Sequence, residues 1–112
     1  MKEAIETASA FVRAVAAGDA EAAHSMLSHQ LAADVAAADL STQFGALADD
    51  MGGVTGIGQA MVILEDWPGM SDEDLAMVYV PLEGDEFSEA VTLTISASDD
   101  SLRISAIEWG RP

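Results

Sequence analysis

The spacing of apolar residues changes at Gly52-Gly53, and this change limits the fold more than any other feature of the 112-residue chain. Before this pair, apolar residues recur every three or four positions, which is the period of an amphipathic helix. After it, apolar and polar residues alternate, as they do in a half-buried strand. Helices followed by strands predict an α+β fold with the helices on one face of an antiparallel sheet.

The first half of the chain predicts three helices. The apolar stripe of the first consists of Ile5, Ala8, Phe11, Val12 and Val15. Gly18 ends this helix, because glycine readily adopts the left-handed conformation of a helix C-terminus, and Asp19 caps the next one. The second helix is expected from Ala20 to about Ala33. The third is expected to begin at Asp39 as its N-cap and to end at Gly52-Gly53.

The second half predicts four strands joined by short polar turns, which is typical of an antiparallel meander. The expected strands lie within residues 57–67, 75–86, 90–101 and 102–109. Pro81 is expected to end the second of them at an edge or a bulge. The sequence therefore predicts that residues 1–112 form one α+β domain, with three N-terminal helices packed on a curved four-stranded sheet.

The charge balance limits the partners of the chain. Twenty acidic residues stand against four basic ones, so the net charge is −16. Such a chain repels phosphate backbones and anionic lipid head groups, and we expect no nucleic-acid partner. The acidic surface serves solubility in one interpretation and adaptation to a saline habitat in the other.

Cysteine is absent from the sequence, which excludes disulfides, thiolate metal sites and thiol nucleophiles. No stretch approaches the ~20 apolar residues that span a bilayer, so no membrane insertion is expected. The first residues carry charges at Lys2, Glu3 and Glu6 and lack the apolar region of a secretory leader. We expect a cytoplasmic protein if the chain is complete and an exported one if a leader has been removed.

The order of these elements resembles the nuclear transport factor 2-like superfamily, a cystatin-like cone that includes the ketosteroid isomerases. The closest branch is a bacterial family of domains of unknown function. The matching residues are Gly18-Asp19, Ala23, Leu27, Gly53 and Ile57. The resemblance implies a cavity between the helices and the sheet, and a homodimer formed through the outer face of the sheet. These residues are caps and core positions, so no catalytic residue is carried over.

Enzymes of this superfamily place a carboxylate base and a tyrosine or histidine donor inside the cone. Glu108 alternates with Leu102, Ile104 and Ala106, and Tyr79 is the single tyrosine of the chain. These two residues are the catalytic candidates; the alternative is a solvated strand end for Glu108 and a core position for Tyr79. The residues expected to line the cavity are Phe11, Phe44, Tyr79, Ile95 and Glu108.

No metal or other cofactor is expected. His24 and His29 are five residues apart, about 140° around a helix, and cannot bind one metal ion together. Ser25 and His29 are four apart, but nothing orients the imidazole as a base. The acidic clusters Asp72-Glu73-Asp74, Asp85-Glu86 and Asp99-Asp100 lie in expected turns and lack the pattern of a calcium loop. They are interpreted as solvated turns.

Two functions remain open at this stage. The first is a non-catalytic cone that binds a small apolar ligand or a protein partner and self-associates, because residues 75–80 are apolar on both faces of their strand. The second is an enzyme of the isomerase or dehydratase type, with Glu108 as proton acceptor and Tyr79 as donor. The sequence favours the first.

Overall fold

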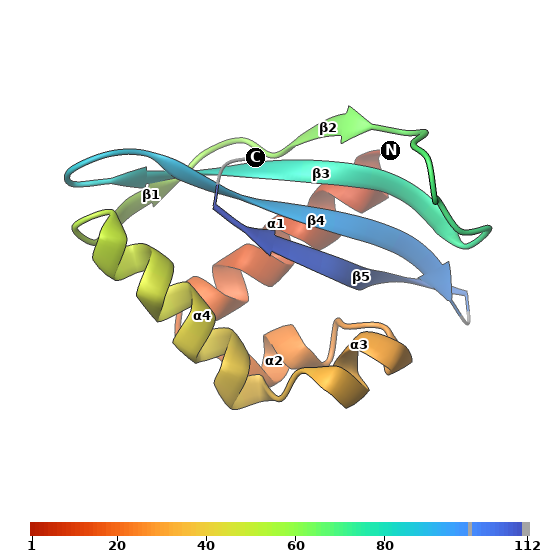
Figure 1. Ribbon diagram of the computed structural model, residues 1–112, viewed down its shortest axis with the longest axis horizontal. Coiled ribbons are helices and arrows are strands. Elements are labelled where there is room, and N and C mark those ends of the chain that lie inside the picture. The colour runs from red at the N-terminus through yellow and green to blue at the C-terminus, as the bar shows by residue number, and fades with distance from the viewer. Residues whose placement is uncertain (99, 111–112) are drawn as a thin grey trace.

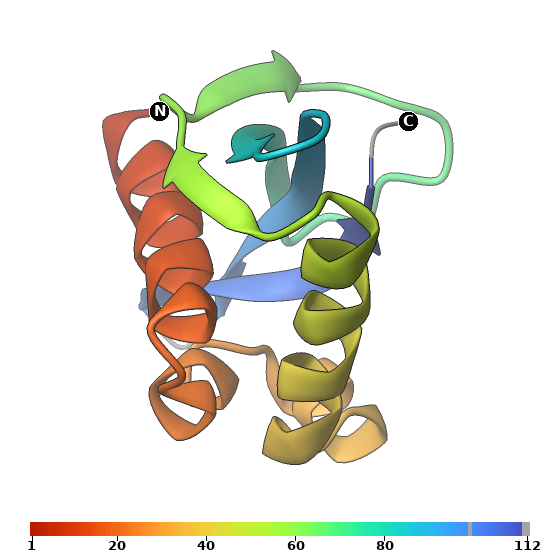
Figure 2. The ribbon, with the colours of Figure 1, turned by 90° about the vertical axis from the view of Figure 1, so that its left-hand side faces the viewer.

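The computed structural model describes residues 1–98 and 100–110, and in this part of the chain four helices precede five strands (Figure 1). The helices are α1 (Lys2–Ala16), α2 (Ala20–His24), α3 (His29–Asp34) and α4 (Ala37–Asp50). The strands are β1 (Val54–Ile57), β2 (Met61–Leu64), β3 (Asp74–Gly84), β4 (Glu89–Ser98) and β5 (Ser101–Trp109). All helices lie on one side of the sheet, with α1 and α4 apart beneath it (Figure 2). The predicted α+β fold is confirmed.

The junction between α1 and α2 has the predicted caps. Gly18 takes a φ of 83°, and the backbone N–H of Asp19 donates to the carbonyl of Ala14 at 2.9 Å. This bond satisfies a carbonyl that the end of the helix leaves open. The Asp19 carboxylate accepts the N–H of Ala22 at 3.2 Å and so caps α2.

The predicted second helix is interrupted between α2 and α3. The residues between them pair with the edge of β5: Ser28 N–H donates to the carbonyl of Ile104 at 2.8 Å, and Ile104 N–H donates to that of Met26 at 2.9 Å. Arg103 donates from Nη1 to the carbonyl of Ser25 at 2.6 Å, at the end of α2. These tertiary bonds take backbone groups that a continuous helix would use internally, which is why the prediction of one helix over 20–33 was wrong.

Helix α4 begins three residues earlier than predicted, with Ala36 in place of Asp39 as its N-cap. Asp39 is not its N-cap; its carboxylate accepts the N–H of Ala36 at 2.9 Å from inside the first turn, where a negative charge also suits the helix dipole. The C-terminus is as predicted. Gly52 and Gly53 have φ of 78° and 99°, and Gly53 N–H donates to the carbonyl of Ala48 at 2.8 Å.

The sheet is open and antiparallel, in the order β1-β3-β4-β5, and β2 also pairs with β3. The first predicted strand, within residues 57–67, corresponds to β2. Strand β1 lies before it except for Ile57 and was not predicted, so the described sheet has five strands instead of four. The two strands are separated at residues 58–60 and lie along successive parts of one edge. Pro81 does not end β3: it pairs with Ala90, and its carbonyl accepts the N–H of Gly58 at 2.8 Å. The carbonyl of a proline still takes part in a ladder although its nitrogen cannot donate.

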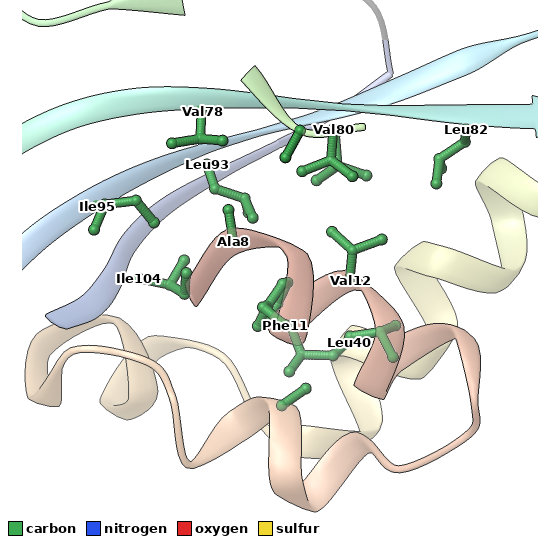
Figure 3. Packing of buried hydrophobic residues seen from close by; sticks show 14 of the residues in the cluster. Ala8, Phe11, Val12, Leu40, Val78, Val80, Leu82, Leu93, Ile95 and Ile104 are labelled. Atoms are coloured by element: carbon green, nitrogen blue, oxygen red, sulfur yellow. The ribbon is translucent and has the colours of Figure 1, made fainter. Parts of the chain in front are cut away.

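The core lies between α1 and the sheet. Figure 3 shows Ala8, Phe11 and Val12 of α1 among strand residues and Leu40 of α4. The largest fully buried side chains are Phe11, Leu40, Met51, Leu82, Leu93, Ile95, Ile104, Val12, Val78, Val80 and Val91. Each such side chain contributes about 1.5–3 kcal/mol by leaving water. The space between helices and sheet is thus occupied by side chains of the protein.

Candidate functional site

The sheet has one face against the helices and one turned away from them, which we call the outer face. Val78 and Val80 belong to the core, so Tyr79 between them points outward. Residues that pair across antiparallel strands share a face, and the register extends the outer face from Tyr79 to its neighbours. The central part of the outer face comprises Met61, Leu64, Met77, Tyr79, Thr92, Thr94, Ala106 and Glu108.

Glu108 lies on this outer face and is exposed. Strict alternation along β5 predicts that Glu108 shares a face with Ile104. However, the register shifts between the pairs Thr94–Ala106 and Ile95–Ile104, and Ser105 is the extra residue of this bulge. A bulge reverses the alternation beyond it, so Ile104 faces the helices while Ala106 and Glu108 face away.

The five residues predicted to line a cavity are not brought together. Phe11 and Ile95 are fully buried parts of the core. Phe44 is half-buried and meets the Trp109 ring edge-on, with ring centroids 6.3 Å apart and planes at 69°. Tyr79 is half-buried on the outer face, and Glu108 is exposed there. Of the predicted cavity residues, two therefore lie in the core, one at the margin of the core, and two on the face of the sheet opposite to the helices.

Tyr79 and Glu108 do lie in one row across the outer face. Tyr79 pairs with Thr92, and Thr92 pairs with Glu108, so the two candidates are two strands, or about 10 Å, apart. Thr92 is 6 % exposed, and among the described residues its Oγ1 is a buried polar atom without a hydrogen-bond partner.

The histidines have separate surroundings. His24 Nε2 lies 2.7 Å from the carbonyl of Val35 and so ties α2 to the segment before α4. Ser25 and His29 are not on one helix, because α2 ends before Ser25 and α3 begins at His29. No group of three or more metal-binding side chains lies together in the part of the chain that the structure describes. Asp99 of the third acidic cluster lies outside the described residues.

A polar pocket of about 400 Å³ lies at the end of the sheet where β3 begins and β4 ends, the right-hand end in Figure 1. It is lined by Ser28, His29, Gln30, Ser71, Glu73, Asp74, Ser96, Ser98 and Ser105. Ser96 follows the buried Ile95 and Ser105 follows the buried Ile104, so both hydroxyls are on the side of the sheet away from the core. The start of α3 closes the pocket beside the edge of β5.

A chain of hydrogen bonds crosses the floor of this pocket. Ser96 Oγ lies 2.6 Å from Asp74 Oδ1 and 2.7 Å from Ser105 Oγ. A hydroxyl has one proton, and Ser96 gives it to the carboxylate. Ser105 has two acceptors for its own proton, Ser96 Oγ and the Thr94 carbonyl at 3.4 Å. Asp74 Oδ2 accepts the backbone N–H of Ser71 at 2.9 Å.

These bonds stabilise the ionised form of Asp74. Burial by itself would raise the pKa of this carboxyl, but the hydrogen bonds from Ser96, Ser71 and Ser105 outweigh it and hold the pKa below the ordinary value of an aspartate. Asp74 is therefore ionised at neutral pH. Its half-buried place at the start of β3 differs from the solvated turn that the sequence predicts.

The pocket could not be found by reading along the chain. Asp74, Ser96 and Ser105 come from three strands, and the bulge at Ser105 brings its hydroxyl to the other two. The one signal in the sequence is the series Thr92, Thr94, Ser96 and Ser98, which indicates a polar face of β4 but not what lies opposite it. Among the described residues, no helix is long and apolar enough to cross a membrane.

Comparison with known proteins gives one informative match. The chain is similar in structure to a protein of Campylobacter jejuni described as an NTF2-like transpeptidase, with a TM-score of 0.61 over 90 % of this chain and 95 % of that one. The two sequences are 14 % identical, so the likeness concerns the fold. Neither a family model nor a curated protein matches the sequence. Helices α1 to α4 on one face of an open antiparallel sheet thus give this chain the fold of the nuclear transport factor 2-like superfamily.

Proposed function

We propose that this protein is a non-catalytic binding module that self-associates through the outer face of its sheet. The observation that carries the proposal is the exposed apolar edge of this face. Met61 and Leu64 of β2 are 49 % and 42 % exposed. They pair with Tyr79 and Met77 of β3, and together the four side chains form an apolar area at one side of the outer face.

The distribution of charge favours a second copy as the occupant. Two chains of net charge −16 repel each other at most orientations. Glu108 is charged at one side of this face, and Asp74 and Glu83 lie on the same side of the sheet toward the two ends of β3. A contact centred on β2 and the middle of β3 therefore keeps these carboxylates at its margin, where repulsion between two copies is weakest. A two-fold contact places the same apolar residues of both copies together.

The packing inside the cone supports a surface function. Phe11, Leu93 and Ile104 fill the space that the resemblance assigns to an apolar ligand, and each is fully buried. The alternative of an isomerase or dehydratase requires an acid–base pair inside the cone. Glu108 and Tyr79 lie on the outer face instead.

Acyl transfer, suggested by the description of the Campylobacter jejuni protein, also has little support in this chain. A transpeptidation of the acyl-enzyme kind needs a serine or cysteine nucleophile with a base that removes its proton. The chain has no cysteine. Ser96 donates to Asp74, whose lowered pKa makes it a weak base.

The test is the molar mass in solution, measured by light scattering on a sizing column. We expect a dimer for the natural sequence and a monomer for Leu64→Asp, with the dissociation constant raised at least about tenfold, because the new charge has to be desolvated in the interface.

Phe87→Asp is the matched control. Phe87 is 41 % exposed and lies in the β3–β4 connection, away from β2. Its substitution by aspartate adds the same charge as Leu64→Asp at a position outside the proposed interface. This variant is expected to stay dimeric. A natural chain that remains a monomer at about 100 μM, or a Phe87→Asp variant that dissociates as Leu64→Asp does, would refute the proposal.

A further inference from the structure

The polar pocket at the start of β3 is separate from the apolar edge of the outer face, and its chemistry indicates a ligand. Its volume of about 400 Å³ is within the range of small-molecule sites. Its lining brings together side chains from β3, β4, β5 and the start of α3, so it exists because of the tertiary fold.

The hydrogen bonds on the pocket floor leave acceptors rather than donors facing the cavity. Ser96 uses its single proton on Asp74, and Ser105 has acceptors for its proton within the protein. Each hydroxyl oxygen keeps lone pairs. Asp74 accepts from the Ser96 hydroxyl and the Ser71 backbone N–H, and the hydroxyls of Ser71 and Ser105 also turn toward this carboxylate. The protons of the floor are thus directed at Asp74, and its negative charge remains accessible from the cavity.

The charge of the lining has the same sign. Asp74 and the exposed Glu73 are both carboxylates, and no lysine or arginine lines the pocket. Phosphates and carboxylic acids are therefore repelled, whereas a cation is attracted and the field of a strongly acidic protein increases this attraction.

A metal ion fits less well than an organic cation. Calcium requires six to eight oxygen ligands, and the described residues hold no group of three or more carboxylate or histidine side chains suited to a metal. An ammonium group presents three N–H donors in three directions. The acceptors Asp74, Ser96 and Ser105 approach from three adjacent strands, which suits this arrangement better than the flat fork of a guanidinium.

We propose that this pocket binds a small primary amine in its ammonium form, with Asp74, Ser96 and Ser105 accepting hydrogen bonds from the nitrogen. Glu73 at the rim adds attraction to the cation, and the remaining volume takes the carbon chain. This site is independent of self-association through the outer face.

The experiment is a titration of the ¹⁵N-labelled natural chain with 1,4-diaminobutane at pH 7.5, followed by NMR. We expect saturable shifts that are largest at the amides of Ser71, Ser96 and Ser105. The neutral isostere 1,4-butanediol is expected to cause shifts at least about tenfold weaker at equal concentration, because it lacks charge-assisted hydrogen bonds.

Two variants and one control distinguish binding of the diamine in the pocket from unspecific attraction of a cation to an acidic protein. Asp74→Asn is expected to raise the dissociation constant of the diamine at least about tenfold. Glu73→Gln, at an exposed position where folding tolerates the change, is expected to raise this constant a few fold. Asp72→Asn removes the same charge in the same turn but does not line the pocket. It is expected to leave binding within about twofold.

Three results would overturn the proposal. Shifts spread equally over all acidic turns, or equal weakening by Asp72→Asn and Asp74→Asn, would mean unspecific attraction. Binding of the diol as strong as that of the diamine would mean a site for neutral polyols. Stoichiometric displacement of the diamine by calcium chloride would mean a metal site. The molar mass of Asp74→Asn, which is expected to equal that of the natural chain, distinguishes loss of the pocket from loss of self-association.

Discussion

At the scale of single residues, buried polar groups on the outer side of the sheet differ in how they are satisfied. Ser96 is 3 % exposed and shares its hydroxyl with Asp74 and Ser105. Thr92 is nearly as buried on the same strand, but its Oγ1 is without a partner among the described residues. A buried hydroxyl that loses water without gaining a hydrogen bond costs about 1–3 kcal/mol.

Thr92→Val is expected to increase the free energy of unfolding by about 1 kcal/mol, because valine keeps the shape and removes the unsatisfied oxygen. Urea unfolding followed by circular dichroism measures the change. Thr94→Val is the control, since Thr94 lies two residues along the same face and is 9 % exposed. If Thr92→Val increases the free energy of unfolding no more than Thr94→Val does, the Thr92 hydroxyl has a hydrogen-bond partner in solution and the prediction is wrong.

At the scale of the elements, the ends of the helices are fixed by local chemistry and their interiors by packing. Gly18 ends α1 at positive φ, whereas Gly45 lies inside α4 with helical backbone. A Cβ added at either glycine would meet nothing within 4 Å. The two positions therefore differ in backbone conformation and not in available space.

The same substitution should have opposite effects at these two glycines. Gly18→Ala is expected to lower the free energy of unfolding by about 1 kcal/mol, because a Cβ disfavours the left-handed conformation. Gly45→Ala is expected to raise it by about 0.5–1 kcal/mol, because alanine is the better helix former. Thermal and urea unfolding of both variants measure the difference. Equal signs would show that packing, rather than backbone preference, decides one of the two positions.

At the scale of the whole molecule, charge opposes compactness. Twenty acidic and four basic residues on a chain of this size repel one another across the folded surface. Basic side chains near helices or edges, such as Arg103 at the end of α2, offset a small part of this repulsion. Screening of these charges by dissolved salt should therefore increase the free energy of unfolding.

Sodium chloride is expected to raise the Tm by several degrees, with most of the increase below about 0.3 M, because the Debye length already falls to about 8 Å at 0.15 M. Scanning calorimetry at several salt concentrations measures this, at a protein concentration where the molar mass does not change with salt. A Tm that is constant below about 0.3 M, or that increases only at higher salt, would contradict a screening effect and indicate a general effect of salt on apolar burial.

The sequence by itself determined the features that depend on neighbours along the chain. The caps at Gly18-Asp19 and Gly52-Gly53, the apolar stripe of α1 and the strand period of β4 follow from local backbone preference, and they were enough to predict the α+β fold. The alternation of β4 did not predict its burial, because Thr92, Thr94 and Ser96 are buried as well as the apolar residues between them. Where the prediction failed, tertiary hydrogen bonds competed with local ones, as at the break between α2 and α3, where backbone groups pair with Ile104.

Only the tertiary structure decided the faces and the site. One extra residue at Ser105 turns Glu108 away from the helices, since a strand has a period of two and a single insertion exchanges its faces. The same bulge brings Ser105 to Ser96 and, through it, to Asp74. These three residues are distant in sequence, and no local preference encodes their meeting; it follows from the register of three paired strands.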